Sequence, residues 1–83
     1  MERKELAEEI IDFCVTYRLL GNPKRILLAK GRVEEELGNT YFVESLINML
    51  ILKTRYIKSI DKRRLKALFI ELERVRLDLE YNE

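Results

Sequence analysis

The chain has 83 residues, of which 47% are hydrophobic and 37% are charged, and its formal net charge is +1. This length supports one small domain with a modest core, and the share of apolar residues excludes an intrinsically disordered chain. With one proline, three glycines and no useful stretch of alternating apolar and polar residues, strands are not expected. The abundance of Lys, Arg and Glu, without Gln or Trp, is typical of thermophile proteins.

Three features bear on where the protein works. A single cysteine, Cys14, cannot form an internal disulfide, which favours a cytoplasmic setting. Met1–Glu9 alternates charges without an apolar segment, so no signal peptide is expected. The longest uninterrupted apolar runs, such as Met49–Leu52, are far shorter than the roughly 18 residues of a membrane span. We therefore expect a soluble protein that does not insert into membranes.

The first predicted helix covers residues 3–20. Its apolar residues recur at alternating spacings of four and three, as on one helix face: Leu6, Ile10, Phe13, Tyr17 and Leu20. Gly21-Asn22-Pro23 then predicts a turn, because glycine suits the left-handed position after a helix. Asparagine followed by proline suits the start of the next helix.

The second predicted helix covers residues 23–37 and has Gly31 in its interior. Glycine costs about 1 kcal/mol relative to alanine at such a position. No Ser, Thr, Asp or Asn stands directly before Arg32 to cap a new helix, so we expect one continuous helix with a bend at most. Gly38-Asn39-Thr40 predicts the end of this helix and the cap of the next.

The third predicted helix covers residues 41–58 and is the most apolar of the four. Most of its apolar residues occupy roughly half of the helix circumference. Such a helix must be covered on most sides, which predicts that it is the central element of the domain. Ser59 or Asp61 can then cap a fourth helix.

The fourth predicted helix covers residues 62–80 and has two apolar sides. The main side recurs at spacings of three and four: Leu65, Leu68, Leu72, Val75 and Leu79. The opposite side has a thinner apolar line: Ile70, Leu77 and Tyr81. Such a second line is typical of a subunit interface, although single exposed apolar residues are also normal on protein surfaces.

These elements predict an all-α fold that forms a single domain over residues 1–83. Connections of two to four residues make sequential helices antiparallel neighbours, which favours an up-down four-helix bundle. The alternative is a pair of helical hairpins that open and complete their hydrophobic cores in a dimer.

Motifs that would indicate catalysis or metal binding are missing. Histidine is absent, which removes the commonest general base and the commonest zinc ligand. Cys14 lies on the apolar face of the first helix and is expected to be a core residue. No glycine-rich phosphate loop is present. We therefore expect a non-enzymatic protein without cofactor, metal or small-molecule substrate.

A helix-turn-helix centred on Gly38 is disfavoured by two positions. Where that motif needs a small residue and a buried apolar residue, the chain has Glu34 and Glu44. The supposed recognition helix would also be the most apolar of the four, with too few polar side chains to contact base edges.

The charges are strongly segregated along the predicted bundle. In an up-down bundle, the ends of the first and third helices meet the starts of the second and fourth at one end, here called the basic pole. The basic pole has two carboxylates, Asp12 and Asp61, against eleven cations, whereas the opposite end has thirteen carboxylates against five cations. The eleven cations are Arg18, Lys24, Arg25, Lys30, Lys53, Arg55, Lys58, Lys62, Arg63, Arg64 and Lys66.

The preference of charged residues for particular helix ends does not explain this segregation of charges. Cations at helix starts, such as Lys62 and Arg63, oppose the helix dipole at a cost of about 0.3 to 1 kcal/mol each. A pattern that opposes local preference favours a functional cause, although a solvated, thermophile-like surface is the simplest alternative.

Two functions can use the segregated charges. In the first, the basic pole of one molecule meets the acidic end of another, and the protein is a self-associating assembly module, expected as a homodimer. Its expected interface residues are Leu52, Ile70, Leu77 and Tyr81. In the second, the basic pole binds the phosphate backbone of nucleic acids, chiefly within Lys53–Lys66. Its expected contact residues are Arg55, Lys58, Lys62, Arg63 and Arg64.

The near-neutral net charge favours the first function narrowly. Dedicated nucleic-acid-binding proteins usually have a clear basic excess, and this chain has a net charge of only +1. Another protein with an acidic surface is a further partner that the basic pole would suit.

Overall fold

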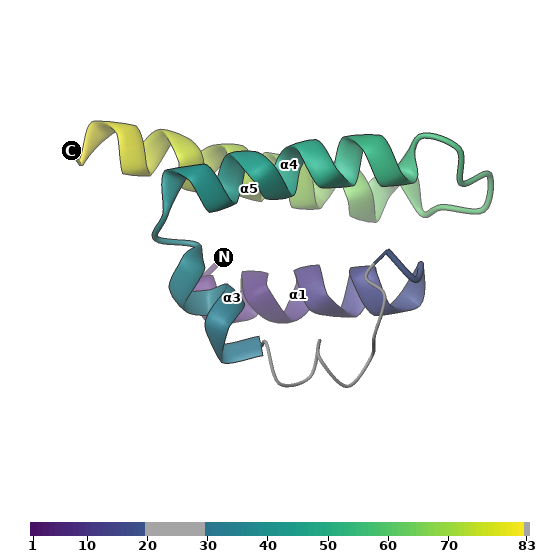
Figure 1. Ribbon diagram of the computed structural model, residues 1–83, viewed down its shortest axis with the longest axis horizontal. Helices are drawn as coiled ribbons and strands as arrows, with labels where there is room; N and C mark the ends of the chain where they lie inside the picture. The colour runs from purple at the N-terminus through teal and green to yellow at the C-terminus, as the bar shows by residue number, and fades with distance from the viewer. Residues whose placement is uncertain (20–29, 83) are drawn as a thin grey trace.

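A computed structural model describes residues 1–19 and 30–82, which form four helices and no strand. The helices are α1 (Arg3–Thr16), α3 (Lys30–Glu36), α4 (Thr40–Thr54) and α5 (Lys62–Tyr81) (Figure 1). Residues 23–29 of the predicted second helix lie outside the described part. Gly31 lies inside α3, so the described part of that helix has no break at the glycine.

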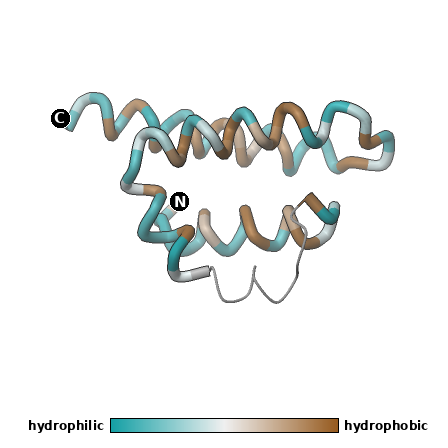
Figure 2. The backbone as a smooth tube through the Cα atoms, viewed as in Figure 1, coloured by the Kyte–Doolittle hydropathy of each residue, from teal (hydrophilic) through white to brown (hydrophobic). Residues whose placement is uncertain are grey.

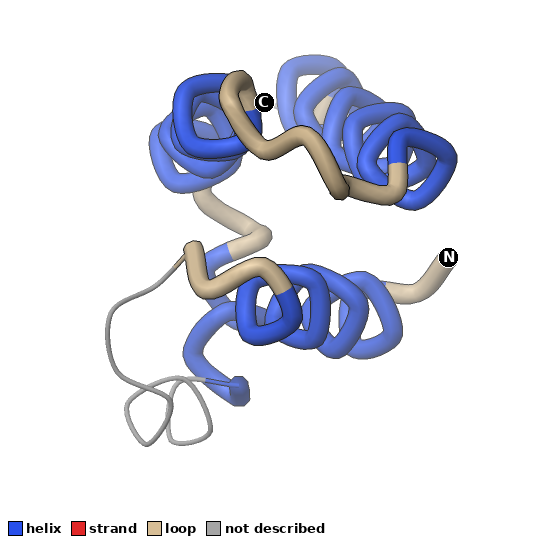
Figure 3. Tube along the Cα trace, turned by 90° about the vertical axis from the view of Figure 1, so that its right-hand side faces the viewer, coloured by secondary structure: helices blue, strands red, loops and turns tan. Residues whose placement is uncertain are grey.

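The helices form two layers (Figures 1 and 3). α4 and α5 lie side by side in one layer, and α1 and α3 form the other. α1 and α4 run in the same direction, while α5 runs back antiparallel to both (Figure 1). α5 also packs on α1 and so joins the layers. The predicted all-α helical bundle is confirmed.

The hydrophobic core lies between the layers and follows the helical periodicity of the sequence (Figure 2). The largest fully buried side chains include Leu6 and Phe13 from α1, Leu50 from α4 and Leu72 from α5. Burying each such side chain contributes about 1.5 to 3 kcal/mol relative to exposure. The described residues of the predicted apolar faces of the first and fourth helices are therefore found in or against the core, and Leu20 lies outside the described residues.

α1 ends at Thr16, four residues before the predicted end at position 20. Arg18 adopts the left-handed conformation, with φ of 53°. Its N–H donates to the carbonyl of Val15 (3.2 Å), and the N–H of Leu19 donates to the carbonyl of Cys14 (2.9 Å). This is a Schellman motif with arginine, rather than the usual glycine, at the C′ position. The motif turns Leu19 into the core, where it is buried.

α4 ends at Thr54, four residues before the predicted end at position 58. The Thr54 hydroxyl donates a hydrogen bond to the backbone carbonyl of Leu50. At the end of α1, the Thr16 hydroxyl likewise donates to the backbone carbonyl of Asp12 (2.7 Å). Such bonds and the β-branched side chain weaken helix continuation. Ile57, which fits the helical spacing, instead packs on the core from the loop that follows.

Two predicted caps are present. The Asn39 side chain accepts a hydrogen bond from the N–H of Tyr41 (3.0 Å) at the start of α4. The Asp61 side chain accepts one from the N–H of Arg64 (3.1 Å) at the start of α5. Each satisfies a backbone donor that lacks a partner inside its helix.

Candidate functional site

The candidate site is the loop of residues 55–61 between α4 and α5, together with the first turn of α5, where five cations accompany one carboxylate. This loop lies at the same end of the bundle as the end of α1 (Figures 1 and 3). Ile57 and Ile60 pack against the core, whereas Arg55, Tyr56 and Lys58 are exposed. The partly buried isoleucines thus hold the loop in place, while its charged residues lie in solvent.

Polar contacts also fix this loop to the end of α1. The ammonium group of Lys53 donates to the carbonyl of Leu19 (2.9 Å). The N–H of Asp61 donates to the hydroxyl of Tyr17 (2.8 Å), and the Tyr17 ring packs on Phe13 with ring centroids 4.7 Å apart. The loop therefore has anchors on both sides, and its geometry is set by the core.

Among the described residues, Arg64, unlike the other expected anion contacts, already has partners inside the molecule. Its guanidinium pairs with Asp12, lies 3.7 Å from Glu9 and sits over the Phe13 ring at 5.7 Å from the centroid. The hydrogen bond that the guanidinium donates to Asp12 raises the pKa of Arg64 and outweighs the opposing effect of its desolvation. Of the five residues expected to contact an anion, this one has a structural role.

Three of the other expected residues line one hollow. A surface depression with a volume of about 450 Å³, here called the basic depression, is lined by Arg55, Tyr56, Ile57, Lys58 and Lys62. Within residues 1–19 and 30–82, none of its three cations forms an ion pair or a side-chain hydrogen bond. Their charges are therefore directed at solvent, which is the arrangement that an anionic ligand needs.

The surroundings of the basic depression add to its positive potential. Arg63 follows Lys62 in the first turn of α5 and is exposed. The nearest carboxylate in sequence, Asp61, caps α5 through the N–H of Arg64. Among the other predicted cations of the basic pole, Lys24 and Arg25 lie outside the described residues, and Lys30 is the first residue of α3.

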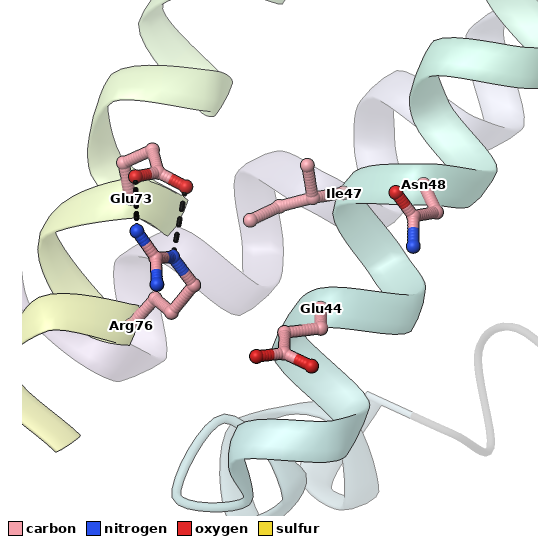
Figure 4. A pocket seen from close by; sticks show the side chains of 5 residues that line it. All are labelled: Glu44, Ile47, Asn48, Glu73 and Arg76. Atoms are coloured by element: carbon pink, nitrogen blue, oxygen red, sulfur yellow. Dashed lines mark hydrogen bonds and ion pairs between the residues drawn. The ribbon is translucent and has the colours of Figure 1, made fainter. Parts of the chain in front are cut away.

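A second hollow, between α4 and α5, has a different character (Figure 4). It has a volume of about 290 Å³ and is lined by Glu44, Ile47, Asn48, Glu73 and Arg76. The Arg76 guanidinium donates two hydrogen bonds to Glu73 (3.0 and 2.9 Å) and one to Glu80 (2.7 Å). This pairing lowers the pKa of Glu73. Because its one cation is already bound by two carboxylates, this hollow is a poor anion site.

The four residues expected at a subunit interface are all exposed and come from two helices. Ile70, Leu77 and Tyr81 are 59%, 41% and 86% exposed and lie on one side of α5, opposite the buried Leu72. Leu52 is 61% exposed but lies on α4. Three of the four thus form a line on α5, here called the α5 outer line, and the place of Leu52 in an interface stays a prediction.

The sequence did not predict which cations have partners inside the molecule. Arg64 and Asp12 are 52 positions apart, so no local spacing relates them. The ammonium of Lys53 likewise contacts a backbone carbonyl 34 positions away. The only local signal is the helical register, which places Arg64 nearer the core side of α5 than Arg63.

Comparisons with other proteins add no functional information. No protein-family model, curated protein or solved structure matches the chain. Within its described residues, no helix is long and apolar enough to cross a membrane.

Proposed function

We propose that the protein binds the phosphate backbone of nucleic acids through the basic depression. The main support is the convergence of Arg55, Lys58 and Lys62, all without an internal partner in the described chain, on one hollow. Lysine and arginine contact phosphates by charge and hydrogen bonding, and arginine can do so with two parallel bonds. Such contacts give affinity with little dependence on base sequence.

The net charge of +1 is compatible with this proposal because the charges are segregated. Residues 53–66 include seven cations and one carboxylate, whereas most carboxylates lie elsewhere in the chain. Screening limits electrostatic attraction to about 8 to 10 Å at physiological ionic strength. A phosphate at the basic depression therefore responds mainly to the local charge rather than to the total charge.

The anchoring of the loop also favours binding. Association costs less free energy when the contact groups are already ordered. Two hydrogen bonds hold the chain on either side of the depression. One runs from the Lys53 ammonium to the Leu19 carbonyl, and the other from the Asp61 N–H to the Tyr17 hydroxyl. Only the side chains of the cations have to lose freedom when a phosphate binds.

The direct test is fluorescence anisotropy with a labelled oligonucleotide at about 50 mM salt, where phosphate contacts are strongest. The double variant Arg55→Ala/Lys58→Ala should weaken binding at least tenfold. A charge-matched control, Lys4→Ala/Arg32→Ala, removes one lysine and one arginine that are exposed outside the basic depression and should leave binding unchanged.

Salt dependence gives a second measurement on the same variants. Three phosphate contacts predict a slope of log affinity against log salt of about −2 for a single strand, and about 20-fold weaker binding at 200 mM than at 50 mM salt. The double variant should reduce the slope to about −0.7. Absence of binding at low salt, or equal losses in both double variants, would contradict the proposal.

Self-association is the second candidate function, and the α5 outer line favours it. Ile70 and Leu77 expose large apolar side chains at a spacing of seven residues, with Tyr81 one turn further on. An apolar line on the exposed side of a helix is typical of helix–helix interfaces. The line lies outside the basic depression, so dimerisation and nucleic-acid binding are compatible.

A further inference from the structure

We infer that the ligand of the basic depression is a single-stranded nucleic acid, held by stacking of an unpaired base on Tyr56. This inference rests on the proposed function and specifies its substrate. Tyr56 lines the depression between Arg55 and Lys58 and is 84% exposed. Cations that bind phosphate beside an aromatic ring that stacks on bases are the usual components of single-strand binding sites.

The exposure of Tyr56 has no structural explanation in the fold. The next residue, Ile57, packs on the core, whereas the Tyr56 ring lies in solvent. Its hydroxyl makes no hydrogen bond within residues 1–19 and 30–82. A large ring without burial or a polar partner contributes little to stability, so its position at the depression favours a role in binding.

Two other tyrosines are similarly exposed but have different surroundings. Tyr41 is 81% exposed at the start of α4, and Tyr81 is 86% exposed beside Glu80 at the end of α5. Neither is among the residues that line the basic depression. Tyr56 alone among these three combines an exposed ring with adjacent unpaired cations, and the other two provide matched controls.

The shape of the site favours a single strand over a duplex. In a duplex, each base is stacked on its neighbours and its flat face is not accessible, whereas unpaired bases can stack on aromatic side chains. Double-stranded DNA is commonly read by a helix or a two-stranded ribbon in the major groove. The basic depression is lined by four residues of the loop and by Lys62, the first residue of α5, and presents neither element.

The test compares a labelled strand of about 12 nucleotides, within the usual site size of such proteins, with its duplex and with an abasic strand of equal length. The wild type should bind the single strand more tightly than the other two. Tyr56→Ala should weaken single-strand binding about tenfold and leave duplex and abasic binding unchanged. Tyr56→Phe should retain the preference, because the ring is kept.

The controls separate this inference from the proposed function. Tyr81→Ala should not change binding of any of the three ligands. If single strand and duplex bind equally and Tyr56→Ala affects neither, the stacking inference is overturned while phosphate binding stands. If none of the ligands binds at about 50 mM salt, the proposed function itself fails. Near-ultraviolet changes in the tyrosine signal on binding should likewise be lost in Tyr56→Ala.

Discussion

The guanidinium of Arg64, in the first turn of α5, pairs with the carboxylate of Asp12 in α1, 52 positions earlier. The same guanidinium lies over the ring of Phe13, one of the fully buried side chains of the core. This pair joins the start of α5 to α1 and sets where the basic depression lies. It also distinguishes Arg64, which is paired inside the molecule, from the exposed cations Arg55, Lys58 and Lys62.

Replacing Arg64 should therefore affect stability more than binding. The ion pair and the cation–π contact are each about 0.5 to 1 kcal/mol for partly exposed groups, so Arg64→Ala should lower the free energy of unfolding by about 1 to 2 kcal/mol. Urea denaturation followed by circular dichroism measures this loss. Arg63→Ala is the matched control, since Arg63 is exposed and has no partner among residues 1–19 and 30–82. It should change stability by less than about 0.5 kcal/mol.

A double-mutant cycle with Asp12→Ala can isolate the pair itself. The loss in the double variant should be smaller than the sum of the two single losses by about 0.5 to 1 kcal/mol. Simple additivity would show that Arg64 acts through its packing on Phe13 and not through Asp12.

Arg18→Gly should stabilise the protein by about 1 kcal/mol. Arg18 has a φ of 53°, a conformation that costs roughly 1 kcal/mol for a residue with a Cβ and nothing comparable for glycine. Arg18→Ala keeps the Cβ and should gain nothing, which separates backbone relief from loss of the charge. Equal midpoints for the two variants in thermal unfolding would contradict this explanation.

The burial of Cys14 should make stability fall at alkaline pH. Burial raises the pKa of the Cys14 thiol from its ordinary value of 9.0 to about 11, outweighing Lys53, which lowers it. Between pH 9 and 11 the unfolded chain releases the thiol proton while the folded chain retains it, so the free energy of unfolding falls. The thiol contributes a loss of at most about 1.4 kcal/mol per pH unit in that window.

Cys14→Ala isolates this effect from other groups that titrate in the same range. The variant should be less stable than the wild type at pH 7, because it loses packing in the core. The difference in unfolding free energy should then narrow as the pH rises from 9 to 11. A difference that stays constant with pH would show that the thiol is accessible in the folded protein.

Substitutions in the α5 outer line test self-association. We expect the wild type to sediment as a dimer at micromolar concentration and Ile70→Ser/Leu77→Ser to weaken dimerisation about 100-fold or more, because two large apolar contacts per subunit are lost. Both residues are exposed in the monomer, so its fold should be retained. Leu52→Ser, on α4, tests whether the interface extends to that helix. A wild-type monomer, or a dimer that Ile70→Ser/Leu77→Ser leaves intact, would exclude this line as the interface.

The sequence alone predicted the helices and their buried sides. The spacing of Leu6, Ile10 and Phe13 and that of Leu68, Leu72 and Val75 place those residues in the core, where they are found. Asn39 and Asp61 were also recognisable as caps, because a cap bonds to the backbone two or three residues away. These features act over a few residues and are therefore visible as local patterns.

The positions at which α1 and α4 end could not be predicted without the tertiary structure. Apolar spacing continues through Tyr17 and Ile57, and it predicts helices that run on to positions 20 and 58. In the folded protein, Leu19 and Ile57 are drawn against the core from outside their helices. The burial of these two side chains is favoured over further helical turns, at the cost of a left-handed Arg18.

For the candidate site, too, some features could be predicted from the sequence and others only from the tertiary structure. The sequence determined that cations are concentrated between positions 53 and 66, since composition is read directly. Only the tertiary structure decided that Arg64 faces Asp12 while Arg55, Lys58 and Lys62 meet at one depression beside Tyr56. Whether a charge is paired depends on groups that folding brings together from distant parts of the chain, and no local pattern contains that information.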